Sequence, residues 1–318
     1  MRRARQRGVA LLVAIVIFAV ATLLAAAITY SKAMTARRAA GTFTMEQALQ
    51  AGMAAEALAS IALEKDGSEA QTQTSQDWAQ VQPPVELEDT GVWIAAQVED
   101  MSGRFNLNSV VKWDDRTKTF IGDEHQTAIF RKLLVDLDID QRYADLLVDW
   151  IDPDIAPSGS SGGEDTLYLT QVPPYRPPNT FITHASELLA LPGFGRESYR
   201  KIAPYVTALP YDNPLNICTA SGLVLDVSRN SPDNETEFRG MDLPQQREKG
   251  CFPVETVYTG VLTDPLKSEV ARRVEEKSHW FRLRTNVRIG TAEFVLYSLL
   301  YREDTNKVRP VQRSFGSE

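Results

Sequence analysis

Carboxylate side chains gather around one loop near the middle of the chain. They are Asp149, Asp152, Asp154, Glu164 and Asp165, and the loop between them, residues 157–163, is rich in Gly and Ser. Calcium prefers several oxygen ligands on a flexible backbone, which this segment supplies. It is not an EF-hand, because counting from Asp152 as position one places Gly163 where that loop needs a bidentate Glu. Composition alone therefore favours a solvated acidic loop that needs no ligand.

The same loop contains a possible serine nucleophile. Residues 159–163 fit the pattern Gly-x-Ser-x-Gly around Ser161, but that motif needs a preceding strand and a following helix to expose the hydroxyl. The three histidines are scattered and form no metalloprotease pair, and no phosphate-binding glycine loop is present. We therefore expect no enzyme, with an anchored periplasmic hydrolase acting through Ser161 as an alternative.

A second motif could contact nucleic acid. The Pro192-Gly193 turn, followed by a helix from Ser198, resembles a helix-hairpin-helix unit, which grips DNA phosphates through backbone amides. This would suggest a membrane-anchored DNA receptor. The formal net charge is −8, whereas phosphate binding normally uses a large basic surface. A packing role is favoured, because the nearby cations are only Arg196, Arg200 and Lys201.

The two cysteines, Cys218 and Cys251, lie far beyond an apolar N-terminal segment. Their even number and the export that this segment implies make a disulfide plausible. Two buried, unpaired thiols are the alternative.

The N-terminus combines a basic leader with a long apolar run. Val9 to Tyr30 reaches the roughly 20 apolar residues that a membrane-spanning helix needs. The preceding arginines should hold the N-terminus in the cytoplasm. An ordinary signal anchor fits these features, whereas a signal peptide cut near Ala25 to Ala27 fits less well, because its apolar core is typically only ~7–15 residues.

The remaining elements fall into strands and helices. Helix formers continue the anchor over residues 31–62. The strand-like runs 93–98 and 105–108, separated by Ser102-Gly103, predict a strand pair with a tight connection. Four helices are then expected, over residues 127–137, 141–151, 185–191 and 198–209.

The C-terminal third divides into two parts. Residues 216–270 are hard to interpret beyond a short helix from Ser221. Alternating apolar and polar residues over 281–289, a break at Gly290 and a second run over 294–301 predict a β-hairpin.

Taken together, these motifs resemble the minor pseudopilin K family of type II secretion. The leader ending in Gly8 resembles a type IV prepilin leader, which is cut after that glycine, and Val13 stands where most such proteins carry Glu at the fifth mature position. The K branch usually lacks that acid. The resemblance extends to residues 103–108, to 149–152 and to the C-terminal strands.

The resemblance implies an α+β fold. A pilin-like transmembrane and spine helix packs on an antiparallel sheet, and a large helical, SAM-like domain is inserted. The implied divisions are a leader 1–8, a transmembrane helix 9–30, its periplasmic continuation 31–65, a first sheet part 85–115, an inserted helical domain 116–212, a second small unit with the cysteines 213–275, and a closing hairpin with tail 276–318.

The resemblance also implies a function in assembly. A prepilin peptidase would cut after Gly8 and methylate Val9, changing the formal net charge from −8 to −12. The subunit would sit at the pseudopilus tip with minor pseudopilins I and J, with H near the tip, above a shaft of major pseudopilin G. It would be inserted in the inner membrane with its C-terminal domain in the periplasm. Calcium is implied in the helical domain, with Asp152, Asp154, Glu164 and Asp165 as the transferred ligands.

An unpaired ammonium in an apolar helix bundle costs several kcal/mol. In pilin-like filaments the fifth-position Glu of an incoming subunit is thought to neutralise the amine of the subunit above it. A subunit with nothing above it needs no such acid, so Val13 is consistent with a tip position.

Overall fold

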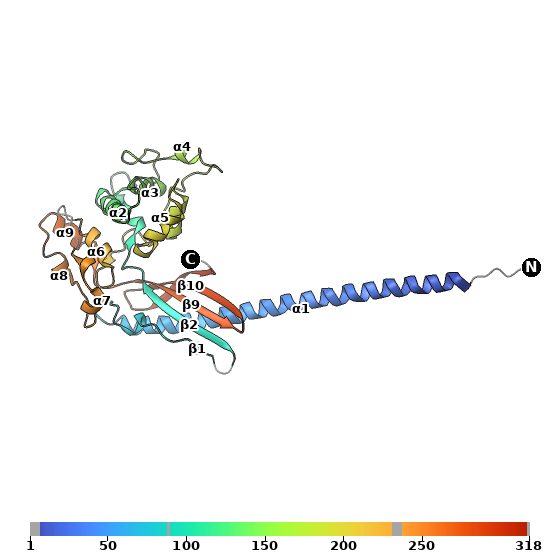
Figure 1. Cartoon of the computed structure of the whole chain (residues 1–318). Helices are drawn as coiled ribbons and strands as arrows, with labels where there is room; N and C mark the ends of the chain where they lie inside the picture. Colours follow the sequence, from blue (N-terminus) through green and yellow to red (C-terminus); the bar gives the residue numbers. More distant parts are fainter. Residues whose placement is uncertain (1–6, 88–89, 231–236, 317–318) are drawn as a thin grey trace, which may run out of the picture.

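A long N-terminal helix dominates the fold. The computed structural model describes residues 7–87, 90–230 and 237–316. Helix α1 (Arg7–Asp66) runs for 60 residues. Its first half projects alone, and its second half lies against a sheet, with two helical units at the end far from the N-terminus (Figure 1). Arg2, Arg3 and Arg5 of the expected leader lie outside the described residues.

The sheet is antiparallel and built from both ends of the chain. Its strands lie in the order β1-β2-β9-β10-β11. Their bounds are β1 (Val85–Glu86), β2 (Val92–Asp100), β9 (Trp280–Ile289), β10 (Ala292–Arg302) and β11 (Val308–Phe315). Along β9, Phe281, Leu283 and Val287 are buried toward the core, as the alternation in the sequence predicts.

Small residues let α1 approach the sheet closely. Ala48, Ala51 and Ala55 are buried on this face. Between them, a Cβ on Gly52 would lie only 2.9 Å from Cδ2 of Leu296 on β10. Leu63 is fully buried near the end of the helix. This face therefore tolerates little added volume.

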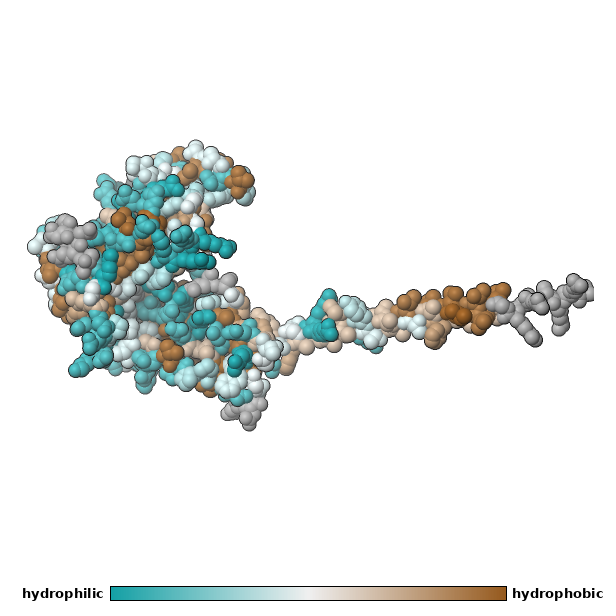
Figure 2. Space-filling view, viewed as in Figure 1, coloured by the Kyte–Doolittle hydropathy of each residue, from teal (hydrophilic) through white to brown (hydrophobic). Residues whose placement is uncertain are grey.

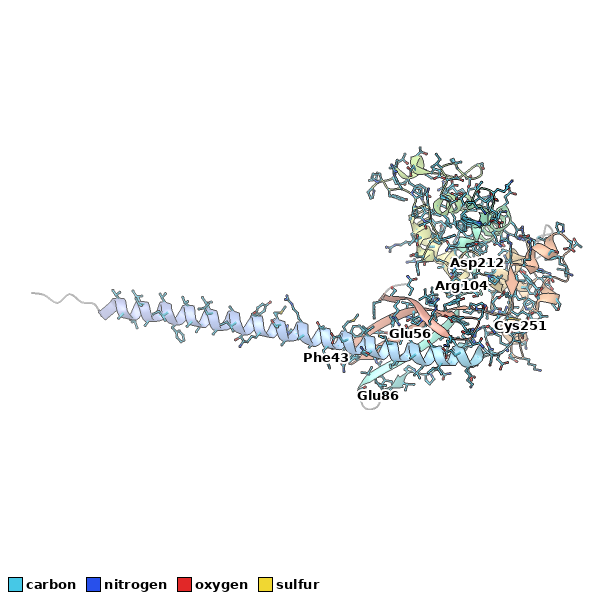
Figure 3. All side chains as sticks on the ribbon, turned by 180° about the vertical axis from the view of Figure 1, so that it is seen from behind. Phe43, Glu56, Glu86, Arg104, Asp212 and Cys251 are labelled. Carbon is cyan, nitrogen blue, oxygen red and sulfur yellow. A yellow bond between two sulfur atoms is a disulfide. The ribbon has the colours of Figure 1, made fainter. Side chains whose placement is uncertain are left out.

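An ion pair between buried Glu56 and exposed Arg313 fixes α1 to the sheet edge. Arg313 of β11 donates from Nε to Glu56 Oε2 (2.8 Å) and from Nη2 to Oε1 (2.7 Å), and Ser298 adds a third bond. Burial alone would raise the pKa of Glu56, but these hydrogen bonds outweigh it and hold that pKa below its usual range. Glu56 faces the strands in Figure 3, whereas Phe43 lies further toward the projecting half.

The first helical unit follows β2 and supplies most of one apolar core, which Leu223 and Val227 complete. Its longer helices are α2 (Glu124–Asp136), α3 (Tyr143–Ile151) and α5 (Gly195–Ile202). They bury a contiguous apolar cluster that includes Phe130, Leu147 and Phe194. The shorter elements are β3 (Phe105–Asn106), η2 (Leu107–Val110), β4 (Val111–Asp114), β5 (Thr119–Gly122), α4 (Asp165–Tyr168), η3 (Ala185–Ala190), η4 (Ala203–Tyr205) and β6 (Val206–Thr207).

Two asparagines hold this unit closed where it leaves and rejoins the sheet domain. Asn108 donates from Nδ2 to the carbonyls of Ile182 and Leu209, both at 2.9 Å. Asn106 donates from Nδ2 to the carbonyl of Pro210 at 2.6 Å. Both side chains are buried. Asn106 and Asn108, in the segment 103–108 that carries the family resemblance, therefore have a structural role.

The second helical unit is small and carries the cysteines. Its elements are β7 (Leu215–Asn216), α6 (Gly222–Ser228), η5 (Phe238–Gly240), α7 (Leu243–Gln246), α8 (Glu255–Tyr258), α9 (Leu266–Ala271) and β8 (Val274–Glu275). The short helix η1 (Asp77–Ala79) is not part of this unit and lies beside the sheet. Ser221 caps α6 by accepting from the Val224 amide, as the sequence predicts. Half-buried Asp100, at the end of β2, accepts hydrogen bonds from Ser278 and Asn216 and so links this unit to the sheet.

The α+β class and the C-terminal hairpin are confirmed. The predicted strand pair across Ser102-Gly103 is wrong. Strand β2 pairs with β1 and β9, whereas β3 pairs in parallel with β6. The helix predicted over 198–209 ends at Ile202, because Pro204 has no amide hydrogen for an α-helical bond and the chain turns into β6.

Candidate metal centre and membrane anchor

The N-terminal helix has the properties of a membrane span. The described helix from Val9 has a mean hydropathy of 3.0 over its most apolar window, and none of that window is buried in the protein. Its side chains form the brown, unpartnered end of the molecule in Figure 2. A single-pass anchor explains why so much apolar surface is bare. The cut after Gly8 stays a prediction, because residues 1–6 of the leader lie outside the described part of the chain.

Three carboxylates meet in the first helical unit. Asp149 lies in the last turn of α3, Asp152 follows that helix directly, and Glu164 precedes α4. One oxygen from each lies within 4.8 Å of the others, and all three residues are buried. The end of one helix and the start of another thus aim three acids at one point.

The loop between these acids is folded around Asp149. Its Oδ1 accepts the Ser158 amide at 2.8 Å, and its Oδ2 accepts the Gly163 amide at 2.6 Å. A Cβ on Gly162 would lie 2.4 Å from Asp149 Oδ2, so this position requires glycine. The Gly/Ser composition therefore serves a tight wrap around a carboxylate.

Two oxygens of the centre have no hydrogen-bond partner within the described structure. They are Oδ1 of Asp152 and Oε1 of Glu164, both buried. Tyr168 and Trp150, close to these acids in the sequence, belong to the same buried cluster, with ring centroids 5.4 Å apart. Buried polar atoms without partners are rare in folded proteins and call for an explanation.

The raised pKa values of these acids also favour a cation-binding role for the centre. Burial, followed by repulsion from Asp154, Asp149 and Glu164, raises the pKa of Asp152 to about 7. Burial and the neighbouring acids likewise raise the pKa of Glu164 to about 7. Burial also raises the pKa of Asp149, against its backbone hydrogen bonds. A hard divalent cation would relieve this repulsion and supply the missing partners, so these residues fit calcium.

The structure brings together only part of the predicted ligand set. Asp152 and Glu164 belong to the centre, and Asp149, which the transferred set omits, joins them. Asp154 instead accepts the Ala156 amide, and Asp165 forms an ion pair with Arg176 at 3.4 Å. The three-residue spacing of Asp149 and Asp152 could have indicated that Asp149 belongs to the centre, because residues three apart lie on one face of a helix.

We expect the chelator-treated protein to lose stability as pH rises from about 4 to about 7. A carboxyl with a raised pKa in the folded state binds a proton there that the unfolded chain has released. Its stabilisation is complete below the unfolded pKa and is lost as pH approaches the folded value of about 7. The free energy of unfolding should fall by about 2–4 kcal/mol across this window, as urea titrations would measure. Asp152→Asn with Glu164→Gln should flatten the profile, and an unchanged profile would contradict this assignment.

The serine motif lacks the context of a hydrolase. Ser161 lies in an exposed turn, with no strand in the residues that lead into it. Among the described contacts, His125 meets Asn230, His184 meets Ser186 and His279 meets a carbonyl of Arg302, so none serves Ser161 as a base.

The Pro192-Gly193 turn has a packing role. Phe194, which follows it, is buried, and its ring packs edge-on against Tyr143 at 4.8 Å. Arg142 donates to the carbonyl of Pro192 at 3.5 Å. Lys201, one of the few nearby cations, pairs with Asp138. The turn thus fastens α5 to α3 in the core.

Cys218 and Cys251 form a disulfide with a sequence separation of 33. Arg247 braces the same loop by donating to the carbonyls of Ile217, Ala220 and Phe252. Glu276 lies beside the sulfurs, but their covalent bond leaves no thiolate pair to bind a metal.

Reduction of this disulfide should destabilise the second helical unit. A closed loop of this length contributes about 3–4 kcal/mol in chain-entropy estimates. Denaturant titration with and without reductant should show a loss of that order, and Cys218→Ser with Cys251→Ser should remove the response to reductant. Equal stability of the oxidised and reduced protein would contradict this expectation.

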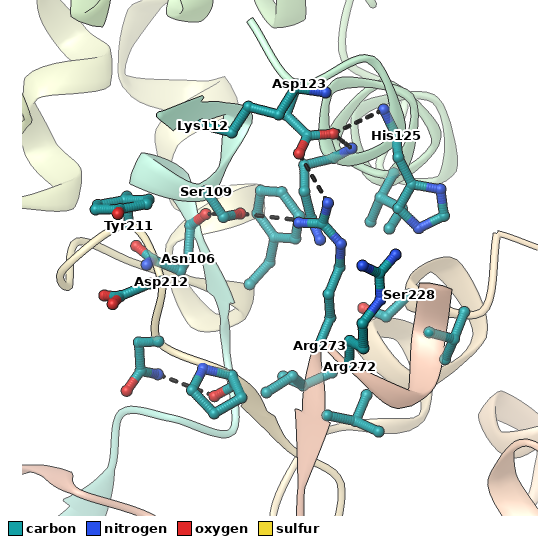
Figure 4. Close-up of a pocket in the computed structure, with 18 of the residues that line it drawn as sticks. Asn106, Ser109, Lys112, Asp123, His125, Tyr211, Asp212, Ser228, Arg272 and Arg273 are labelled. Carbon is teal, nitrogen blue, oxygen red and sulfur yellow. Dashed lines mark hydrogen bonds and ion pairs between the residues drawn. The ribbon is translucent and has the colours of Figure 1, made fainter. Parts of the chain in front are cut away.

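A cavity of about 460 Å³ lies where the two helical units meet (Figure 4). Arg273 reaches across it and pairs with Asp123 and Glu269, both at 2.8 Å. The ion pairs of Arg273 therefore join the two units across the cavity.

The sequence is similar to proteins of a known family. The family model described as "Type II secretion system (T2SS), protein K" matches residues 103–211. A type II secretion system protein K of Pseudomonas aeruginosa is 32% identical over 99% of this chain and 94% of its own length. One from Pectobacterium carotovorum is 32% identical over 99% of this chain and 98% of its own length.

A solved structure has a similar fold. It is the GspK-GspI-GspJ complex from enterotoxigenic Escherichia coli, in which the matching chain has a TM-score of 0.76 and 22% sequence identity. The match covers 88% of this chain and 100% of that one.

Proposed function

This chain belongs to the type II secretion system protein K family, and we propose that it caps the tip of the pseudopilus and starts its assembly. It is a minor pseudopilin of that system, in a family whose members are structural components. The proposed orientation places the N-terminus in the cytoplasm and the folded domain in the periplasm.

The placement of the helical units carries the proposal. Both lie at the end of α1 that is far from the membrane (Figure 1). A further subunit stacked above would have to occupy that space. Val13 adds support, since a subunit without a neighbour above needs no acid to neutralise an amine.

We further propose that pseudopilins I and J pack beside the spine helix, since the similar solved complex contains both. Phe43, Leu58 and Ile61 expose 62%, 69% and 62% of their surface, which is unusual for large apolar side chains outside a membrane segment. Neighbouring helices would cover them. The other proposed partners are H near the tip, major pseudopilin G below and the prepilin peptidase.

A photo-crosslinking amino acid at Leu58 or Ile61 should capture I or J in cells that express the complete system. The same group at Val257, which is exposed on the second helical unit, is a control and should capture neither. Gold labelling of a C-terminal tag should mark one end of isolated pseudopili. Labels along the shaft would refute the tip position, whereas crosslinks from Val257 alone would refute the packing of the spine.

Calcium at Asp149, Asp152 and Glu164 belongs to this proposal. When bound, the ion would supply charge neutralisation between the end of α3 and the start of α4. The protein's own residues hold the loop in place through Asp149, which accepts the amides of Ser158 and Gly163. The centre would thereby stiffen the outermost unit of the tip.

A further inference from the structure

Three cations follow the apolar span directly. Lys32, Arg37 and Arg38 are exposed on α1. No acidic residue occurs between Arg7 and Glu46. Within the described part of the chain, no ion pair is found for any of the three, although most arginines of the folded domain have one. These cations are thus unneutralised within the subunit.

Their height on the helix matches the surface of a bilayer. At 1.5 Å per residue, Lys32 lies about 3 Å beyond Tyr30 and Arg38 about 12 Å beyond it. The headgroup layer adds about 5–7 Å to each side of the hydrocarbon core, and long basic side chains can extend back toward it. Tyr30, 70% exposed, has the amphipathic ring that is favoured at this boundary.

Their directions around the helix favour lipid over a single protein partner. At about 100° per residue, Arg37 and Arg38 lie about 140° and 240° around the axis from Lys32. The three charges therefore surround the helix. A neighbouring protein helix covers one side, whereas headgroups can meet all sides of an isolated anchor.

The charges elsewhere make this segment distinctive. Residues 46–318 contain 27 Lys and Arg against 42 Asp and Glu, a formal net charge of −15. Cations just outside a span also oppose the rule that places positive charge in the cytoplasm. A role at the outer surface would offset that disadvantage.

We propose that Lys32, Arg37 and Arg38 form a basic collar that binds the phosphates of anionic phospholipids at the outer surface of the membrane. The collar holds the subunit at a fixed depth before assembly, and leaving the membrane breaks these contacts. This inference rests on the proposed orientation, but it needs neither the tip position nor partners I and J.

The test uses the full chain in lipid nanodiscs with a fluorophore at Ala33→Cys, the native cysteines remaining in their disulfide. Nitroxide-labelled phosphatidylglycerol and nitroxide-labelled phosphatidylcholine are compared as quenchers at equal mole fraction. We expect about threefold greater quenching by the anionic lipid, decreasing as salt is added. Because the probe lies beside the collar, the arginines at the other membrane surface contribute little.

Two variants separate charge from structure. K32Q/R37Q/R38Q should bring the quenching ratio close to one, whereas R37K/R38K should retain it. The matched control R116Q/K118Q/K267Q removes three exposed cations from the folded domain and should leave the ratio unchanged. Equal quenching in the native chain, or a preference that survives the loss of the collar, would overturn the proposal. Neither result would depend on where the subunit sits in a pseudopilus.

Discussion

Gly8→Leu is expected to leave the chain at full length and to reduce secretion at least about tenfold. The proposed cut follows Gly8, and a bulky side chain there would obstruct a peptidase that accepts glycine. The uncut chain would retain Arg2, Arg3, Arg5 and Arg7. Each charge drawn into a bilayer costs about 2.5–3.5 kcal/mol on insertion scales, so four would oppose any movement of the helix out of the membrane.

Intact mass and export assays in the same cells would measure this effect. Gly41→Leu is the matched control, because it makes the same change on the same helix, where an added Cβ meets nothing within 4 Å. It should be cut normally to begin at a methylated Val9. A Gly8→Leu chain that still begins at Val9, or normal export of uncut chain, would contradict the assignment of the leader.

Calcium should raise the thermal unfolding midpoint of the native chain by about 5–10 °C. At a hundredfold excess over Kd, a ligand adds about 2.7 kcal/mol, and each kcal/mol shifts the midpoint by about 2–4 °C in domains of this size. Asp152→Asn should weaken binding by about a hundredfold, because a buried charged ligand is lost. Asp149→Asn and Glu164→Gln should act in the same direction. Calorimetric titration and differential scanning would measure both quantities.

The control for this prediction tests Asp154 and Asp165, which the family resemblance implies as ligands but which lie outside the carboxylate centre. Asp154→Asn and Asp165→Asn should change calcium affinity by no more than about threefold, because each acts on the centre mainly through its charge at a distance. If these variants abolish binding and Asp149→Asn does not, the centre is wrongly assigned.

The sequence predicted elements whose cause is local. The β9–β10 hairpin follows from alternation around Gly290, and α6 begins at the serine that caps it. The partner of β2 could not be predicted this way. Its register joins Val98 to Leu283 across both helical units, and nothing near Val98 encodes that choice.

The carboxylate centre shows the same division. The composition indicates an acidic loop over residues 149–165, and the family resemblance implies that calcium binds there. Asp149 was omitted because its role depends on a loop that folds back so that Ser158 and Gly163 donate to it. That return depends on hydrogen bonds between residues 9 and 14 positions apart, which the spacing of the acids alone does not reveal.

The pairing of β2 with β9 also constrains how the protein forms. Non-local contacts of this kind slow folding, because a long intervening chain must be closed first. The helical units are complete in the chain before residue 280 and can form first, whereas β2 must wait for the last part of the polypeptide. Until then its edge is open to wrong partners. A chain truncated before Trp280 would therefore keep its anchor and its helical units but be a substrate for quality-control proteases.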